Sequence, residues 1–241
     1  MMIKQIKIIY AEFHLIKPLR LIVVLGCLFF IAACQNVPKS EVDVKPGGNQ
    51  LVKNSNGQYT ADAFSVPSEV RKKVAAWDLS GSFSYVDPKE SGAGRIQWKY
   101  QGRLQDDFIN NESVRLIGPI GTGSVELVSS ETGAHLISGK QRYFGTSADK
   151  LLIDIVGWKM PVEEMRYWLF GMPSPKVEGR FWLNEQGGLQ SLKQSDWEIQ
   201  FERYQVVPEL NAMLPRKITA IHRSNQAKVK LIIKRFQTQL Q

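Results

Sequence analysis

Residues 114–128 read VRLIGPIGTGSVELV: two short arms in which apolar and polar residues alternate, joined by a tip rich in glycine and proline. The alternation predicts a strand in each arm, and the composition of the tip prevents regular pairing there. A hairpin tip normally carries polar residues because it projects into water. Ile120 breaks that rule. It either folds back to fill the core or is held out to contact lipid.

The N-terminus has the length and charge pattern of a signal peptide. Residues 21–33 are uncharged, too few to span a bilayer as a helix, and preceded by Lys17 and Arg20. Residues 31–34 (IAAC) fit a bacterial lipobox, in which the cysteine thiol receives a diacylglyceryl group before cleavage. We therefore expect Cys34 to be the lipid-attachment residue. The alternative is a signal anchor that happens to contain a cysteine.

The sequence divides into three parts. Residues 1–33 are the predicted lipoprotein signal peptide, 34–62 a polar, flexible tether, and 63–241 a folded domain. Gln35 is not the aspartate that marks a lipoprotein for the inner membrane, so we expect an outer-membrane protein anchored by lipid and facing the periplasm. Cys27 leaves with the signal peptide and Cys34 is acylated, so the domain must be stabilised by packing without a disulfide.

The folded part alternates with a period of two over most of its length. Antiparallel strands with one apolar face are predicted around residues 77–85, 96–100, 114–128, 181–183, 197–201 and 218–233. Three short amphipathic helices are predicted at 68–76, 146–157 and 161–171. The fold class is therefore α+β, mainly β, with a single curved antiparallel sheet covered by helices. Such a sheet encloses either a packed core or an apolar cavity.

Composition and motifs give no support to catalysis. The domain contains two histidines, His135 and His222, both in polar strand-like surroundings, and it lacks metal-ligand spacing, a phosphate loop and a hydrolase elbow. The chain has 31 Lys and Arg against 23 Asp and Glu, a formal net charge of +8. Without residues 1–33 the mature chain keeps 27 Lys and Arg against 22 Asp and Glu, a net charge of +5. An excess of this size usually means only solubility, and it also favours an anionic lipid surface or an acidic partner. An exported chain without a nucleic-acid motif is not expected to meet DNA or RNA. We expect no enzyme, no metal and no cofactor beyond the covalent lipid.

Several motifs together resemble the LolB family, the outer-membrane lipoprotein receptors of the lipoprotein localisation (Lol) pathway. The order WDLSGSFSY, RIQWKY, VRLIGPIGTGSVEL, PVEEMRYWLFGMPSP, DWEIQFERY, LPRKI and KVKLIIKRF covers residues 77–236. The most specific parts are GPIGTGS and the segment Trp168 to Pro173.

The resemblance implies an incomplete antiparallel β-barrel under a lid of about three short helices, enclosing an apolar cavity. It also implies a monomer that takes triacylated lipoproteins from the soluble carrier LolA and inserts them into the inner leaflet of the outer membrane. Family members carry an exposed apolar residue, usually leucine, in a protruding loop. Ile120 occupies that position here, which makes residues 118–121 the expected membrane-insertion loop: Gly118, Pro119, Ile120 and Gly121.

The expected acyl-chain cavity is lined by the apolar faces of strands and helices. The candidates are Phe83, Trp98, Leu116, Leu151, Ile155, Trp168, Trp197 and Phe201. Large aromatic residues are more often core than ligand lining, so a structural lipoprotein with a filled core stays open as an alternative. A carrier of other lipids is a second alternative.

Overall fold

The computed structural model of the chain describes residues 41–44, 52–53, 59–60, 66–104, 108–121, 123–177, 179–184 and 188–241. The chain divides into two compact units, Met1–Pro38 and Lys39–Gln241, and the second contains all the described residues. The predicted signal peptide and the predicted lipid-attachment residue Cys34 lie outside the described residues. Both stay predictions.

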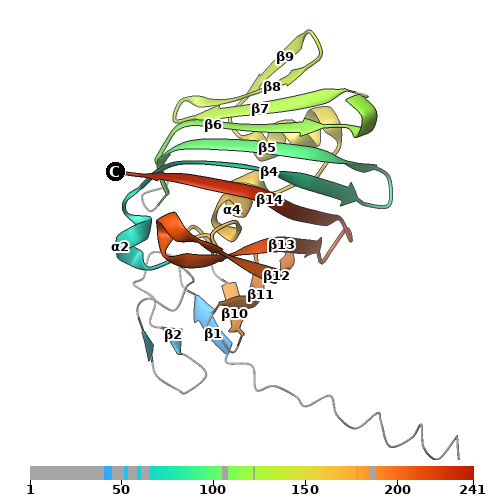
Figure 1. The fold of residues 1–241 in the computed structure, drawn as a ribbon. Helices are drawn as coiled ribbons and strands as arrows, with labels where there is room; N and C mark the ends of the chain where they lie inside the picture. The colour runs from blue at the N-terminus through green and yellow to red at the C-terminus, as the bar shows by residue number, and fades with distance from the viewer. Residues whose placement is uncertain are drawn as a thin grey trace, which may run out of the picture. The chain divides into compact units, whose positions relative to one another are not determined.

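Twelve strands of the described residues form one antiparallel sheet (Figure 1). Each strand pairs with its spatial neighbours, and β1 and β9 are the two edges, which do not pair with each other among the described residues. The sheet is therefore open rather than closed. In spatial order the strands are β1 (Glu41–Val44), β10 (Gly179–Leu183), β11 (Leu189–Gln194), β12 (Trp197–Val207), β13 (Ala212–His222), β14 (Lys228–Leu240), β4 (Val74–Val86), β5 (Ser91–Arg103), β6 (Phe108–Ile117), β7 (Ser124–Ser130), β8 (Gly133–Ser138) and β9 (Gln141–Gly145).

The inner face of the sheet is apolar and the outer face polar, as the period-two alternation predicts. Along β4, for example, Trp77, Leu79 and Phe83 are buried, and the polar residues between them are partly exposed. The inward side chains of the strands and helices join in one continuous core cluster. The prediction of a mainly β, single antiparallel sheet is confirmed.

Two helical segments cover the inner face, and both lie in the connection from β9 to β10 (Figure 1). The first consists of α3 (Ala148–Leu151), which continues directly into the π-helical turn η3 (Leu152–Val156). The second is α4 (Val162–Trp168). The third predicted helix is α2 (Ser68–Arg71), which stops before β4 begins at Val74 and lies beside one end of the sheet. The structure thus does not confirm a lid of three helices: two segments cover the sheet, and α2 packs against the core through Val70.

Part of the segment predicted to be a flexible tether is paired in the structure. β1 pairs antiparallel with β10, from Glu41 opposite Trp182 to Val44 opposite Gly179. β2 (Val52–Lys53) and β3 (Tyr59–Thr60) pair with each other in a separate two-stranded sheet. The four residues of β1 thus supply a backbone partner to β10, which would otherwise be the sheet edge.

The register defines two ends of the sheet. Arg95 of β5 lies opposite Ile117, the last residue of β6, so the β6–β7 loop is at the same end as the β4–β5 turn. We call this the loop end. The opposite, far end carries the β12–β13 connection, which forms the 3-10 turn η4 (Pro208–Leu210).

Candidate functional site

The β6–β7 hairpin closes on a six-residue tip. Ile117 and Ser124 are the last paired residues, and the Gly118 N–H donates to the Gly123 carbonyl at 3.0 Å. Between them Pro119–Gly121 form the 3-10 turn η2. Proline suits the first position of such a turn because its φ is already fixed near the required value. The tip is therefore a defined turn that projects beyond the paired strands.

Ile120 is fully exposed at the apex of this tip, with a relative accessibility of 104%. Its φ and ψ are 53° and 23°, in the left-handed region. A β-branched residue is rare in this region, and holding one there costs on the order of 1–3 kcal/mol. Of the two interpretations of Ile120, the structure has the one in which the side chain is held out. The conformation needs its surroundings to maintain it, and no burial of Ile120 compensates for it.

Seven of the eight predicted cavity residues are buried in the core cluster: Phe83, Trp98, Leu116, Leu151, Trp168, Trp197 and Phe201. The fold brings these residues together from four strands and both helical segments. In the structure they pack as a core, so an open acyl-chain cavity is not what their arrangement shows. The burial fits both a filled core and a cavity that opens when the helices move.

Ile155 does not join them. It is 39% exposed, because η3 is a π-helical turn rather than the predicted α-helix. In an α-helix Ile155 would follow Leu151 on one face at a spacing of four. Here the Gly157 N–H donates to Ile153 O at 3.1 Å and is shared with Leu152 O, five residues back, and the wider turn puts Val156 against the core instead. The assignment of Ile155 to the inner lining was wrong for this reason.

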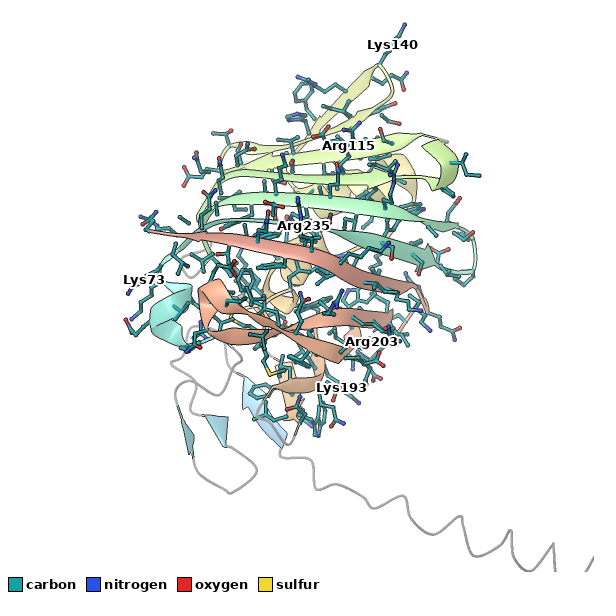
Figure 2. All side chains as sticks on the ribbon, viewed as in Figure 1. Lys73, Arg115, Lys140, Lys193, Arg203 and Arg235 are labelled. Carbon is teal, nitrogen blue, oxygen red and sulfur yellow. The ribbon has the colours of Figure 1, made fainter. Side chains whose placement is uncertain are left out.

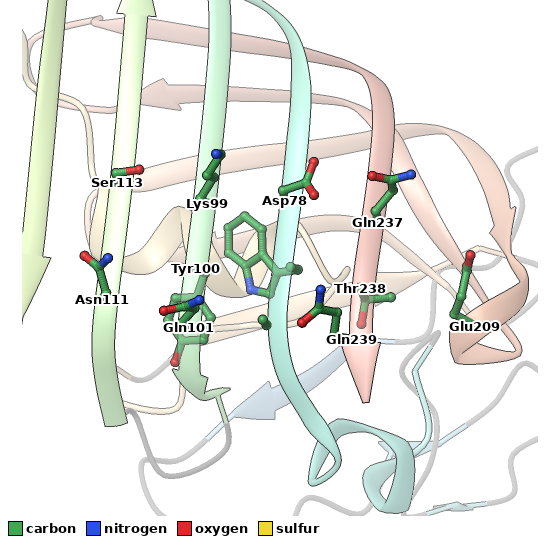
Figure 3. Close-up of a pocket in the computed structure, with 12 residues that line it drawn as sticks. Asp78, Lys99, Tyr100, Gln101, Asn111, Ser113, Glu209, Gln237, Thr238 and Gln239 are labelled. Atoms are coloured by element: carbon green, nitrogen blue, oxygen red, sulfur yellow. The ribbon is translucent and has the colours of Figure 1, made fainter. Parts of the chain in front are cut away.

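A hollow of about 430 Å³ on the outer face of the sheet is of a different kind (Figure 3). It crosses β6, β5, β4 and β14, and the side chains around it are mostly polar. Those labelled in Figure 3 include Asp78, Lys99, Gln101, Asn111, Ser113, Gln237 and Gln239. Acyl chains would gain nothing from such a lining.

A buried ion pair joins α4 to the sheet. The side chains of Arg166 and Glu112 are each 1% exposed. Arg166 Nε donates to Glu112 Oε1 at 3.0 Å and its Nη2 to Oε2 at 2.5 Å, a bidentate arrangement. The indole N–H of Trp98 donates to the same Oε1 at 2.9 Å. The guanidinium also lies 5.7 Å from the centre of the Tyr100 ring. The carboxylate thus fixes the position of α4 over the sheet.

The segment after α4 is fixed by a buried glutamine of β11. Gln194 Nε2 donates to the carbonyls of Ser174 and Val177, both at 2.7 Å, and its Oε1 accepts from the Ser174 N–H at 2.8 Å. The Trp168 indole donates to the same oxygen at 3.3 Å. One amide therefore holds both the end of α4 and the chain that leaves it.

At the loop end, the chain after η3 is fixed by Trp158. Its ring stacks on Tyr85 with centroids 5.4 Å apart, and Gly92 of β5 leaves space for it, since a Cβ there would lie 2.2 Å from Trp158 Cζ2. The Tyr85 hydroxyl donates to Asp87 and accepts from the Lys159 N–H at 3.1 Å. Burial, with the hydrogen bond to Asp87, raises the pKa of Tyr85 to about 12.

An acidic residue links the two helical segments. Asp149 Oδ1 accepts from the N–H of Glu163 at 3.3 Å, near the N-terminus of α4. Burial, reinforced by the charges of Glu163 and Glu164, raises the pKa of the Asp149 carboxyl well above its ordinary value. The protonated form of this carboxyl is therefore favoured by folding.

Sequence reasoning missed Glu112, Arg166 and Gln194 as structural residues. A signal was present for Glu112, which has the same strand parity as Val114 and Leu116 and therefore faces inward. Arg166 lies between Met165 and Trp168 of the predicted helical stripe. Charged residues at inward positions indicate a buried pair, because neither charge is stable there alone.

Basic side chains lie on many elements of the described residues. The basic side chains labelled in Figure 2 come from different elements, among them Lys140 in the β8–β9 turn, Arg115 on β6 and Lys193 on β11. Two of the labelled residues form ion pairs: Lys193 with Glu198 at 3.2 Å and Arg235 with Asp78 at 3.2 Å. Among the described residues, no group of three or more His, Cys, Asp and Glu could hold a metal ion. Within the same residues no helix is both long and apolar enough to cross a membrane.

The fold and site thus define a class: an open antiparallel sheet with helices over its apolar face and an exposed apolar residue at a hairpin tip. The family model described as "Outer membrane lipoprotein LolB" matches residues 75–236. The chain belongs to the LolB family.

Curated relatives of the same name are also similar to this chain. The protein named "Outer-membrane lipoprotein LolB" from Pseudomonas aeruginosa (strain LESB58) is 30% identical to this chain, and the match covers 61% of this chain and 69% of the relative. The protein of the same name from Cellvibrio japonicus (strain Ueda107) is also 30% identical, and the match covers 68% of this chain and 78% of the relative. A solved LolA superfamily protein, NE2245 from Nitrosomonas europaea, is 10% identical with a TM-score of 0.46, over 71% of this chain and 89% of that chain.

Proposed function

We propose that this protein receives lipoproteins from a soluble periplasmic carrier of the LolA type and inserts them into the inner leaflet of the outer membrane. Membership of the LolB family supports a role in outer-membrane lipoprotein localisation. In this proposal the protein is itself anchored by lipid on Cys34, faces the periplasm and acts as a monomer without a cofactor or a catalytic step.

The observation that carries the proposal is the exposure of Ile120. A fully exposed isoleucine in a left-handed backbone serves no packing in the fold, and its position at a projecting tip suits insertion into a bilayer. In the proposal the tip, residues 118–121, enters the phospholipid leaflet while the rest of the domain stays at its surface. The client lipoprotein is transferred into the leaflet at the point where the tip enters it.

The client's chains need an apolar site during transfer. Each methylene exposed to water costs about 0.8 kcal/mol, so three long acyl chains together cost tens of kcal/mol. The buried residues Phe83, Trp98, Leu116, Leu151, Trp168, Trp197 and Phe201 are the proposed lining once the helices move away from the sheet. The transfer runs from carrier to receptor to bilayer, each site binding the chains more strongly than the last.

The test is the substitution Ile120→Glu in the lipidated protein. The fold should be almost unchanged, within about 0.5 kcal/mol, because the side chain is exposed. The variant should still accept a lipoprotein from the loaded carrier but fail to deposit it in liposomes, so that client accumulates on the receptor. Ile120→Leu should deposit normally.

The matched control is Val206→Glu, which places the same charge on another exposed apolar residue, 66% accessible, at the far end of the sheet. It should deposit at the rate of the parent protein. Normal deposition by a folded Ile120→Glu variant would show that the loop has no part in insertion.

The packed arrangement of the core favours one rival: a structural outer-membrane lipoprotein that binds no client lipid. A hydrophobic fluorescent probe distinguishes the two. Retention of the probe, with displacement by a triacylated lipopeptide, supports a receptor. No retention by the folded protein supports the structural lipoprotein, and displacement by phospholipid alone supports a carrier of other lipids.

A further inference from the structure

The π-helical turn η3 presents an apolar face to solvent. Ile153 is 45% and Ile155 39% exposed, while Leu152 of the same turn is fully buried. The solvent face of a helix that covers a core normally carries polar and charged residues. Here two of its exposed residues are isoleucines.

The charge between these two isoleucines is neutralised locally. Asp154 lies between them in sequence and pairs with Lys150 at 3.2 Å, one turn earlier. Both partners are largely exposed, with side-chain accessibilities of 49% and 68%. The exposed surface of η3 therefore combines two apolar side chains with a paired charge, a composition that favours a contact rather than free solvation.

The backbone geometry is what exposes Ile155. Ordinary α-helical spacing would place Ile155 on the side of Leu151, toward the core. In the π-helical turn the Gly157 N–H is shared between Ile153 O, at 3.1 Å, and Leu152 O, and Val156 packs against the core instead; Gly157 then ends the turn at a φ of 80°. Such π-turns are frequent at functional sites. As a result, Ile155 is left partly exposed instead of buried.

η3 ends at the loop end of the sheet, where Ile120 also lies. A Cβ at Gly157 would lie 3.4 Å from Glu90 Cγ in the β4–β5 turn, and the ring of Trp158 packs against Gly92 near the start of β5. The register puts the β4–β5 turn and the β6–β7 tip at the same end. In Figure 1 the yellow helical segment lies behind the strands on the side of that tip.

From this juxtaposition we infer that the η3 face, defined by Ile153 and Ile155, is a second contact with the phospholipid leaflet, beside the Ile120 tip. The inference rests on the proposed function, since the partner is the membrane that Ile120 enters. Two contacts fix an orientation where one would leave the domain free to swing about the tip. They set the helical cover of the sheet, rather than its polar outer face, against the lipid surface.

The orientation is tested by the depth of single probes in the lipidated protein in liposomes. Cys27 and Cys34 are the cysteines of the chain. In the proposed lipoprotein, processing removes the first and acylates the second, so an introduced cysteine is the one free thiol for an environment-sensitive fluorophore. The variants are Ile120→Cys, Ile153→Cys, Ile155→Cys and, as the matched control at the far end, Val206→Cys. The parent protein, which should take no label, controls for labelling, and circular dichroism checks each fold.

The measurement is quenching of each fluorophore by phosphatidylcholine spin-labelled in its acyl chains. We expect strong quenching at 120, 153 and 155 and none at 206. Quenching at 120 without quenching at 153 or 155 would overturn the inference and leave the insertion loop in place. No quenching at any position would overturn the loop and the inference together.

A second measurement separates lipid from protein as the partner. The double variant Ile153→Ser/Ile155→Ser should accept client from the carrier normally and deposit it in liposomes about tenfold more slowly. Val206→Ser/Met213→Ser, an exposed apolar pair on neighbouring strands, should have no effect. If the probes at 153 and 155 respond to loaded carrier instead of lipid, the face binds a protein and the inference is wrong.

Discussion

Neutralising one member of the buried Glu112–Arg166 pair should destabilise the protein far more than neutralising both. In Glu112→Gln the guanidinium stays buried without its counter-charge, and in Arg166→Met the carboxylate does. Each side chain is 1% exposed, so water cannot replace the lost partner. Breaking a buried pair in this way costs about 3–5 kcal/mol. That is a large part of a domain stability of roughly 5–15 kcal/mol.

The double variant Glu112→Gln/Arg166→Met removes both charges and keeps an amide oxygen for the indole N–H of Trp98. Replacement of a buried pair by uncharged side chains of similar volume is often neutral or stabilising, by about 1–4 kcal/mol. We therefore expect the double variant to be more stable than either single variant by at least about 2 kcal/mol.

Urea unfolding of the mature protein in mild detergent, followed by tryptophan fluorescence, measures all four free energies of unfolding. Near-ultraviolet circular dichroism establishes that each variant has native packing before unfolding. A double variant whose loss of stability equals the sum of the single losses would refute the reasoning, because the two charges would then be independent.

Three further outcomes follow from single positions. Ile120→Gly relieves the left-handed strain and should raise the free energy of unfolding by up to about 1 kcal/mol in urea, whereas a loss would mean that Ile120 stabilises the fold. Gly92→Ala drives a methyl group into Trp158 and should cost about 1–3 kcal/mol, against less than about 0.5 for Ala93→Ser on the exposed side of the same strand. The pKa of Asp149 is raised in the folded state. The native carboxyl therefore retains a proton that the unfolded chain releases near pH 4. The stability that this proton contributes is lost as pH rises through the native pKa. Asp149→Asn should therefore be more stable than the parent at neutral pH, with the difference vanishing below about pH 4 in melting experiments.

The strands and the inward faces could be predicted from sequence because alternation and burial have the same period. Trp77, Leu79 and Phe83 alternate with polar residues in the sequence and are buried in β4. The edge strand β1 was not predicted. Its four residues become a strand because β10 offers an unpaired edge, which is a property of the folded sheet and not of the segment.

The candidate functional site was likewise predictable only in part. The composition of the hairpin tip singled out Ile120. Whether its side chain is buried or exposed depended on a backbone angle that composition does not encode. Likewise, the stripe of apolar residues around Leu151 predicts a helix, and nothing in it distinguishes an α-turn from a π-turn. The exposure of Ile155 therefore became visible only in the structure.

An open sheet leaves a row of unpaired backbone groups at β9, a template on which another copy of the chain could add a strand and begin a polymer. The charge and length of this edge oppose such growth, and Phe144 on the same strand, 75% exposed, favours it. The edge is five residues long, its turn carries Lys140, and Arg142 projects from it. A second molecule that approached in register would bring like charges together and find few bonds to form. The openness that lets helices cover one face without a closed barrel therefore also leaves an edge whose short length and positive charge limit strand addition between copies.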